Sequence, residues 1–189
     1  MKQYFLLDLD GTIADNGEGI LKSAQYALDA FGIHNQPEAK LRQFVGPPLD
    51  ESFRELYGFS QEQALEAVKK YRERYRVKGV YENKLYPGVA RLVKTLSQRG
   101  SVCLATSKPE VFARKILEMQ GILPDFQVVV GAELDGTRTN KAEVIQAVLE
   151  QLGAPPKSQA VMIGDRKHDI LGAKAVGLES IGVEYGFAP

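Results

Sequence analysis

The sequence predicts an α/β protein with a doubly wound parallel sheet and an α-helical domain inserted after the first strand. From about residue 85 onward, short apolar runs alternate with amphipathic helical patterns, which is typical of parallel strands covered by helices on both faces. The apolar run at residues 5–7 is followed instead by purely helical patterns over residues 15–84, with no strand signal. We therefore expect a core domain of residues 1–14 and 85–189, interrupted by a helical domain at residues 15–84.

The composition is ordinary for a soluble globular protein: of 189 residues, 44% are hydrophobic and 25% are charged. The formal net charge is zero, which gives no support for a nucleic acid polymer or an anionic membrane as partner. No apolar run approaches membrane-spanning length, and no secretory leader precedes the first strand. Together with the single cysteine, Cys103, these features predict a cytoplasmic protein.

Four helices are expected in the inserted domain, each bounded by residue types that start or stop helices. They cover about residues 17–31, 37–44, 49–57 and 60–78. The last is the best marked, because Ser60 and Gln63 form a capping-box pattern. The segment Gly46-Pro47-Pro48 stops the second helix sharply.

Four further strands and four helices are expected in the core domain. The strands are short apolar runs at residues 102–105, 127–130, 160–163 and 180–183. The helices alternate with them, at about residues 89–96, 110–120, 141–152 and 167–176. Strands that alternate with helices in this way are predicted to run parallel in one sheet.

Polar side chains follow these strands at the points where the strands end. The set comprises Asp8 and Asp10, Thr106 and Ser107, Arg138 and Lys141, and Asp165 and Asp169. Because the carboxyl ends of parallel strands meet at one edge of a sheet, these groups are expected to converge there. Clustered carboxylates are costly to bury without a cation, and their oxygens suit Mg²⁺. Acids, hydroxyls and an amine at one edge are the groups that metal-assisted phosphoryl transfer needs.

These residues stand in an order that resembles the four motifs of the haloacid dehalogenase superfamily. The motifs are carried by Asp8-Leu9-Asp10-Gly11-Thr12, Thr106, Lys141 and Gly164–Asp169. The resemblance covers nearly the whole chain, including the inserted helices, which look like the helical cap of the family. Ala105–Pro109 and Gly46-Pro47-Pro48 are most similar to its phosphoglycolate-phosphatase-like branch.

The resemblance implies a Mg²⁺-dependent phosphatase that hydrolyses a small phosphomonoester, phosphoglycolate-like or nucleotide-like, through an aspartyl-phosphate intermediate. It implies that Asp8 is the nucleophile, and that Asp10 protonates the leaving group and then activates water. The helical cap would close over the substrate, with Arg42 and Gly46 near the leaving group. The strand order implied is 5-4-1-2-3, counted along the chain.

The resemblance also assigns the remaining polar groups. Thr106, Ser107 and Lys141 would bind the phosphoryl group, with Lys141 neutralising charge on the nucleophile. Asp8, Asp165 and the backbone carbonyl of Asp10 would hold Mg²⁺, with Asp169 next to them.

Some residues keep alternative interpretations on the sequence alone. Lys108 or Arg138 could supply the cation in place of Lys141, and Asp169 could be an ordinary helix-surface acid. His168 could act as an acid–base group, but its position in an acidic loop favours an orienting or solvent-facing role.

Alternative functions remain open as well. A sugar-phosphate mutase, a pyrophosphatase and a non-catalytic binding or regulatory protein are compatible with the same fold. A dehalogenase and a phosphonate hydrolase are disfavoured, because the branches with those activities resemble this one without the second acid, whereas Asp10 is present here.

Overall fold

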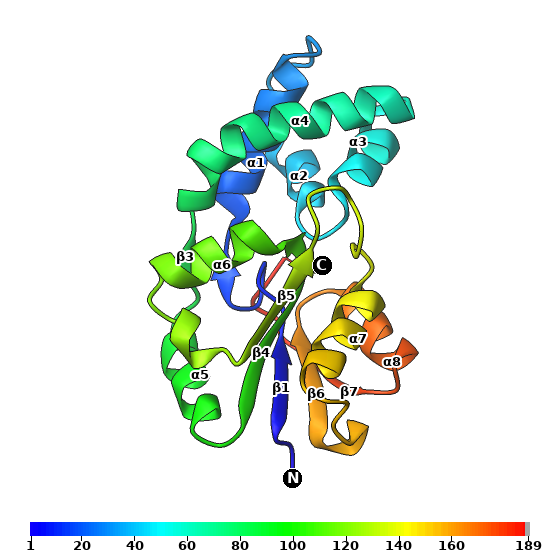
Figure 1. The fold of residues 1–189 in the computed structure, drawn as a ribbon. Coiled ribbons are helices and arrows are strands. Elements are labelled where there is room, and N and C mark those ends of the chain that lie inside the picture. The colour runs from blue at the N-terminus through cyan, green and yellow to red at the C-terminus, as the bar shows by residue number, and fades with distance from the viewer. Residues whose placement is uncertain (188–189) are drawn as a thin grey trace. The chain divides into compact units, whose positions relative to one another are not determined.

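The computed structural model describes residues 1–187 and contains a five-stranded sheet. Its strands are β1 (Tyr4–Leu7), β4 (Ser101–Pro109), β5 (Val128–Ala132), β6 (Ala160–Gly164) and β7 (Glu179–Gly182). Their order is β5-β4-β1-β6-β7, and every adjacent pair is parallel. The predicted fold class and strand order are therefore confirmed. All five strands direct their carboxyl ends to the same edge of the sheet (Figure 1).

Helices cover both faces of this sheet (Figure 1). They are α5 (Val89–Ser97) and α6 (Glu110–Met119) on one face, and α7 (Lys141–Gln151) and α8 (Lys167–Ala175) on the other. Short 3₁₀ turns, η3 (Leu123–Asp125) and η4 (Lys157–Gln159), precede β5 and β6. The layer beneath α7 and α8 is a continuous apolar core that includes Leu6, Cys103, Val144, Ile145 and Met162. Burial on both faces explains the short apolar runs in β1, β4, β5 and β6.

Strand β4 is longer than the apolar run that predicts it. The expected strand ends at residue 105, whereas β4 continues to Pro109. Its pairing with β5 shifts register between Ala105 and Pro109, so the last part of the strand is irregular. The residues in that part are polar, which is why a pattern of apolar residues does not reveal it.

Residues 16–83 form a separate compact unit, called the helical unit below, and the α/β unit comprises residues 1–15 with the chain from residue 84 onward. The helical unit contains α1 (Gly17–Asp29), α2 (Glu38–Leu41), η1 (Arg42–Phe44), α3 (Leu49–Tyr57), α4 (Gln61–Val77) and η2 (Gly79–Tyr81). The capping box is present, since Gln63 N donates to Ser60 Oγ and Ser60 N donates to Gln63 Oε1. The helix expected over residues 37–44 is an α-helical turn followed by a 3₁₀ turn.

The helical unit is held together by aromatic side chains. The Phe53 ring lies 4.8 Å from that of Phe44 and 5.8 Å from that of Phe59, and the Phe31 ring lies 4.8 Å from that of Phe59. Phe53 is fully buried. Ring pairs at these separations contribute attraction beyond the burial of their area.

Two short strands join the ends of the helical unit to the α/β unit. β2 (Ala14–Asp15) pairs antiparallel with β3 (Lys84–Leu85), with Ala14 opposite Leu85 and Asp15 opposite Lys84. This corrects the expectation that residues 15–84 contain no strand. A two-residue strand is too short to show alternation, and it forms here because the chain leaves and re-enters the α/β unit at neighbouring points.

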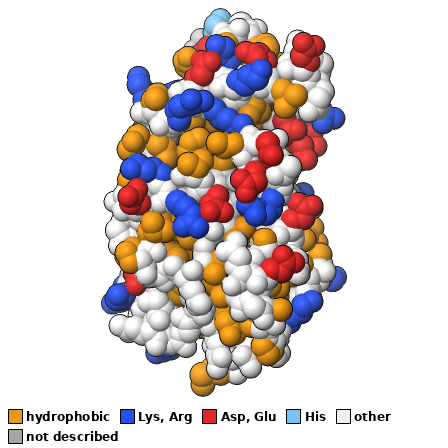
Figure 2. All heavy atoms as spheres, viewed as in Figure 1, with side chains coloured by type: hydrophobic (Ala, Val, Ile, Leu, Met, Phe, Trp, Pro, Cys, Tyr) orange, Lys and Arg blue, Asp and Glu red, His pale blue; other side chains and the backbone are white. Residues whose placement is uncertain are grey.

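Acidic and basic side chains are intermixed over the face of the molecule shown in Figure 2. This agrees with the formal net charge of zero. Within residues 1–187, every helix is too short or too polar to cross a lipid bilayer.

Candidate active site

A glycine turn follows Asp8 and Asp10 after the end of β1. Gly11 has a φ of +84°, which side-chain-bearing residues rarely adopt. Its amide donates to Ala14 O at 3.0 Å, closing the turn. A side chain at Gly11 would also collide with the carboxylate of Asp165. Glycine at this position therefore provides both the turn and the space for a third acid.

Asp8 and Asp169 share one buried cation, Lys141. Lys141 Nζ lies 2.9 Å from Asp8 Oδ1 and 2.8 Å from Asp169 Oδ1, and it donates to Ala105 O at 3.1 Å. Asp169 is fully buried, which removes the interpretation of this residue as a surface acid. Asp169 Oδ2 accepts a hydrogen bond from Arg166 N at 3.0 Å, which fixes its carboxylate at the start of α8.

The position of Lys141 is set by α7, in which it is the first residue, and by α8, which packs against its side chain. Asn140 caps α7, its side chain accepting from Ala142 N at 2.8 Å, so Lys141 is the first residue of the helix. A Cβ at Gly172 of α8 would lie 2.8 Å from Lys141 Cγ. The glycine thus gives the stem of Lys141 room to pass between the helices and reach the acids.

The charges in this cluster perturb one another. Burial alone would lower the pKa of Lys141, but Asp8 and Asp169 outweigh it and hold that pKa above its ordinary value. Burial and the charge of Asp8 raise the pKa of Asp169 to about 6, against the opposing effect of Lys141. One lysine therefore does not fully compensate the two carboxylates.

Asp165 adds a third carboxylate, and the group fits a hard divalent cation. Single oxygens of Asp8, Asp165 and Asp169 all lie within 4.8 Å of one another. Asp165 Oδ2 accepts from Phe187 N at 2.7 Å, whereas Asp165 Oδ1 is buried without a hydrogen-bond partner among residues 1–187. Burial raises the pKa of Asp165, as expected for a carboxylate that lacks a compensating cation. Carboxylate oxygens in this arrangement are the ligands that Mg²⁺ prefers.

The carboxylate of Asp10 takes part in a different ion pair. Lys108 Nζ donates to both of its oxygens, at 3.1 Å and 2.9 Å. Lys108 and Asp10 are each 9% exposed. Asp169, rather than Asp10, thus supplies the third carboxylate of the cluster, and metal binding by the backbone carbonyl of Asp10 stays a prediction.

The other predicted residues of the α/β unit, Thr106, Ser107, Arg138 and His168, differ in burial and in their partners. Thr106 is buried, its Oγ1 accepting from Lys108 N at 3.2 Å, and Ser107 beside it is partly exposed. Arg138 donates to Gly131 O and forms an ion pair with Glu133. His168 is exposed, which agrees with the solvent-facing interpretation.

Arg42 and Gly46 belong to the helical unit. The Arg42 side chain is exposed and its guanidinium pairs with Glu38 at 2.8 Å. Gly46 is exposed in the loop between η1 and α3. Their predicted contact with the leaving group stays a prediction.

Two contributors to the site are not predicted from the sequence. The sequence offers Lys108 only as an alternative to Lys141, and its pairing with Asp10 depends on the irregular end of β4. The segment after β7 also reaches the site: Tyr185 Oη donates to Thr12 O at 2.9 Å, and Phe187 N binds Asp165. Backbone donors and contacts between distant segments leave no pattern in a single sequence.

The chain is similar to known hydrolases and phosphatases. Residues 5–183 match the family described as haloacid dehalogenase-like hydrolase. A 5′-nucleotidase of Pseudomonas aeruginosa is 48% identical over 183 residues, covering 96% of this chain and 82% of the relative. A phosphoglycolate phosphatase of Vibrio cholerae is 32% identical over 191 residues, covering 95% of this chain and 83% of the relative.

A solved structure, that of a predicted phosphatase from Clostridium acetobutylicum, superposes with a TM-score of 0.95 and is 43% identical, covering 100% of this chain and 87% of the other. The match to the family extends over most of the chain and includes all four motifs. The chain therefore belongs to the haloacid dehalogenase-like hydrolase family, as the order of its motifs predicts, and is an enzyme whose relatives include phosphatases.

Proposed function

We propose that this protein is a Mg²⁺-dependent phosphatase that hydrolyses a small phosphomonoester through a phosphorylated aspartate. One observation carries the proposal: three buried carboxylates, those of Asp8, Asp165 and Asp169, lie within 4.8 Å of one another beside a buried lysine. A site with this excess of negative charge is suited to hold a divalent cation and, through it, a phosphate dianion.

The residues of the α/β unit divide the chemistry between them. A carboxylate oxygen of Asp8 forms a bond to phosphorus while the bond from phosphorus to the ester oxygen breaks, and Asp10 gives a proton to that oxygen. A water molecule then attacks phosphorus, Asp10 accepts its proton, and Asp8 is released with inorganic phosphate. Lys141 reduces the repulsion between Asp8 and the phosphoryl oxygens, and the Thr106 hydroxyl binds one of those oxygens.

Asp8 and Asp165, with the backbone carbonyl of Asp10, are the proposed ligands of Mg²⁺, and Asp169 orients Lys141 next to them. When bound there, Mg²⁺ would supply Lewis-acid stabilisation of the charge that develops on the phosphoryl group. The observation that best supports this ligand set is that Asp165 Oδ1 is buried and has no hydrogen-bond partner among the described residues.

The similarity to a 5′-nucleotidase and to a phosphoglycolate phosphatase favours nucleoside 5′-monophosphates and phosphoglycolate as substrates. We propose that the helical unit selects the leaving group, with Arg42 and Gly46 as its candidate contacts. A sugar-phosphate mutase and a pyrophosphatase stay as alternatives, since both use the same four motifs.

Phosphate release from a panel of compounds, with Mg²⁺ and with EDTA, tests the proposal. The panel is phosphoglycolate, nucleoside 5′-monophosphates, a hexose phosphate, pyrophosphate and p-nitrophenyl phosphate. Mg²⁺-dependent release from phosphomonoesters is expected. Release from pyrophosphate alone would identify a pyrophosphatase, and isomer formation that needs a bisphosphate primer would identify a mutase. A folded protein that releases no phosphate from any compound would identify a binding protein and overturn the proposal.

A further inference from the structure

Lys108 and Asp10 form a second buried ion pair, in addition to those of Lys141 with Asp8 and Asp169. The two residues are 98 positions apart in the chain, and the Lys108 amine contacts both oxygens of the carboxylate, at 3.1 Å and 2.9 Å. Contact with both oxygens fixes the rotation of the carboxylate as well as its distance. A buried pair of this kind costs desolvation energy on both sides, so it is poor evidence of a role in stability alone.

The backbone holds Lys108 in this position. The register shift between Ala105 and Pro109 turns the end of β4, and Lys108 N donates to Thr106 Oγ1 at 3.2 Å. Gly131 of β5 packs directly against the same segment, since a Cβ there would lie 2.5 Å from Lys108 O. The lysine is thus placed by an irregular strand end that is itself tied to the phosphate-binding threonine.

The proposed task of Asp10, the partner of Lys108, depends on the orientation of its carboxyl group. Asp10 immediately precedes the turn at Gly11, and it must bring a carboxyl oxygen to within about 2.6–3.2 Å of the ester oxygen to transfer a proton. A displacement of about 1 Å in such a group lowers rates on the order of 100-fold. Whatever fixes the Asp10 side chain therefore affects the protonation of the leaving group more than the binding of the phosphate.

We propose that Lys108 is a positioning residue that acts through Asp10 to align proton transfer to the leaving group. The inference rests on the proposed phosphatase function. It predicts that loss of Lys108 matters for esters whose leaving group needs a proton, and matters little for esters whose leaving group departs as a stable anion.

Phenyl phosphate and p-nitrophenyl phosphate test this, because they differ little in shape and strongly in the basicity of the leaving oxygen. Lys108→Met is expected to lower kcat/KM for phenyl phosphate about 10-fold to 100-fold and for p-nitrophenyl phosphate by less than about 3-fold. Asp10→Asn should show the same contrast between the substrates. Equal losses on both substrates would mean that Lys108 binds the phosphoryl group itself, and no loss on either would mean that it has no part in the reaction; both results overturn the inference.

A double-variant cycle and a rescue complete the test. If Lys108 acts through Asp10, adding Lys108→Met to Asp10→Asn lowers kcat/KM for phenyl phosphate no further, whereas additive losses contradict the inference. Lys108→Arg restores a cation and is expected to recover part of the phenyl phosphate activity. If Lys108→Met does not fold, as judged by circular dichroism, Lys108→Gln is measured in its place with the same criteria.

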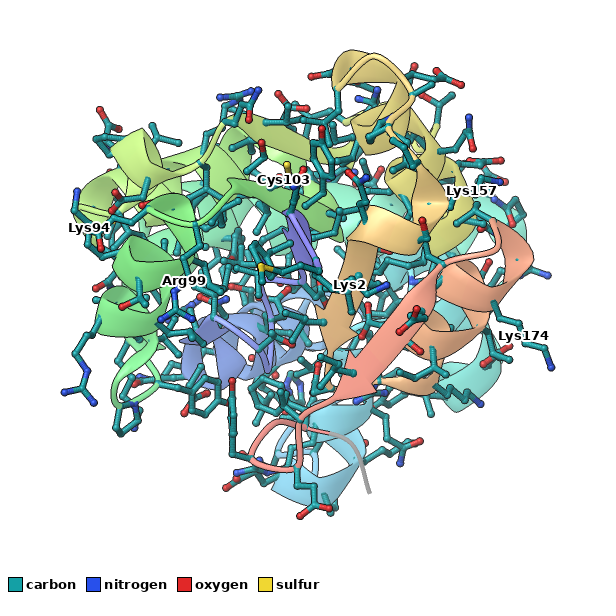
Figure 3. All side chains as sticks on the ribbon, turned by 90° about the horizontal axis from the view of Figure 1, so that it is seen from below. Lys2, Lys94, Arg99, Cys103, Lys157 and Lys174 are labelled. Carbon is teal, nitrogen blue, oxygen red and sulfur yellow. The ribbon has the colours of Figure 1, made fainter. Side chains whose placement is uncertain are left out.

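Lys94→Met is the matched control. Lys94 pairs with Asp125 at the surface and lies at the periphery of the α/β unit in Figure 3. Both substrates should retain their activity in this variant. If the wild-type protein itself releases no phosphate from any ester, the proposed function fails; if it releases phosphate but Lys108→Met shows no contrast, only the inference fails.

Discussion

The α/β unit and the helical unit place their charged side chains in opposite ways. The α/β unit contains six buried charged residues: Asp8, Asp10, Lys108, Lys141, Asp165 and Asp169. Lys108 lies in the last part of β4, and the others follow β1, β5 and β6 in the chain. In the helical unit, all of which the structure describes, the buried polar residues are the uncharged Asn16, Ser23 and Ser52. Its charged side chains form partly or fully exposed pairs such as Lys70 with Glu73.

This difference in buried charge indicates that the α/β unit carries the catalytic residues, whereas the side chains of the helical unit serve its stability. Burying a charge costs free energy that a neighbouring charge rarely returns in full, so six buried charges in one unit are expected only where function requires them. The helical unit lacks such a cluster and packs aromatic rings around Phe53 instead. Substitutions in the two units should therefore fail in different ways: loss of activity in one and loss of stability in the other.

The largest effect is expected at the nucleophile. Asp8→Asn should lower turnover on the order of 10⁴-fold or more while the protein still folds, because the variant keeps the pair between Lys141 and Asp169. Phosphate release and far-UV circular dichroism measure the two parts. Mass spectrometry must exclude deamidation back to aspartate, and activity that persists after that check would show that Asp8 is not the nucleophile.

In the helical unit, Phe53→Ala should lower the free energy of unfolding by about 3–5 kcal/mol, since it removes a fully buried ring from contact with Phe44 and Phe59. Urea denaturation followed by circular dichroism measures the change. Leu65→Ala, at a position 49% exposed in the same unit, should change it by about 0.5 kcal/mol or less. Equal effects from the two variants would refute the aromatic core as the source of stability.

A smaller effect is expected from the best-placed ion pair of the helical unit. Arg74 binds both oxygens of the half-buried Glu82, at 2.8 Å and 2.9 Å, and lowers the pKa of Glu82. Because the folded-state pKa is depressed, the pair stabilises the fold above the unfolded pKa of about 4.3, and this is lost as the pH falls through the folded-state value. Arg74→Met should cost about 1–3 kcal/mol at pH 7 and less in acid.

Urea denaturation of the wild type and Arg74→Met at several pH values measures that difference. Lys70→Met, which breaks an exposed pair with Glu73, is the matched control and should cost about 0–1 kcal/mol. A stability difference for Arg74→Met that grows as the pH falls would contradict the assigned ion pair.

The smallest effect concerns Cys103, a fully buried residue of β4 that belongs to the apolar core and is labelled in Figure 3. Burial raises its pKa to about 12, so almost no thiolate is available at neutral pH. Iodoacetamide should leave the native protein unmodified and alkylate one site after denaturation, as mass spectrometry will show. A Lys94→Cys variant should react once in the native state, and rapid native labelling of the wild type would place Cys103 outside the core.

The sequence predicts those parts of the fold and of the site that belong to a long enough pattern of apolar residues. β1, β4, β5 and β6 contain short apolar runs, and the acids after β1 and β6 stand where those runs end, so the fold and Asp8, Asp10 and Asp165 are predictable together. The pairing of β2 with β3 cannot be predicted, because a strand of two residues shows no periodicity. The pairing of Lys108 with Asp10 cannot be predicted either, because it depends on the irregular end of β4, which lies beyond the apolar run.

The helical unit is inserted between two paired strands, in the position of the loop of a β-hairpin. In this pair, Ala14 lies opposite Leu85 and Asp15 opposite Lys84. Residues 16–83 could therefore be replaced by a short loop or by another folded domain without moving a strand of the five-stranded sheet. Replacement at this junction is thus a route by which one catalytic framework can acquire new leaving-group preferences, since the four motifs all lie outside the exchanged segment.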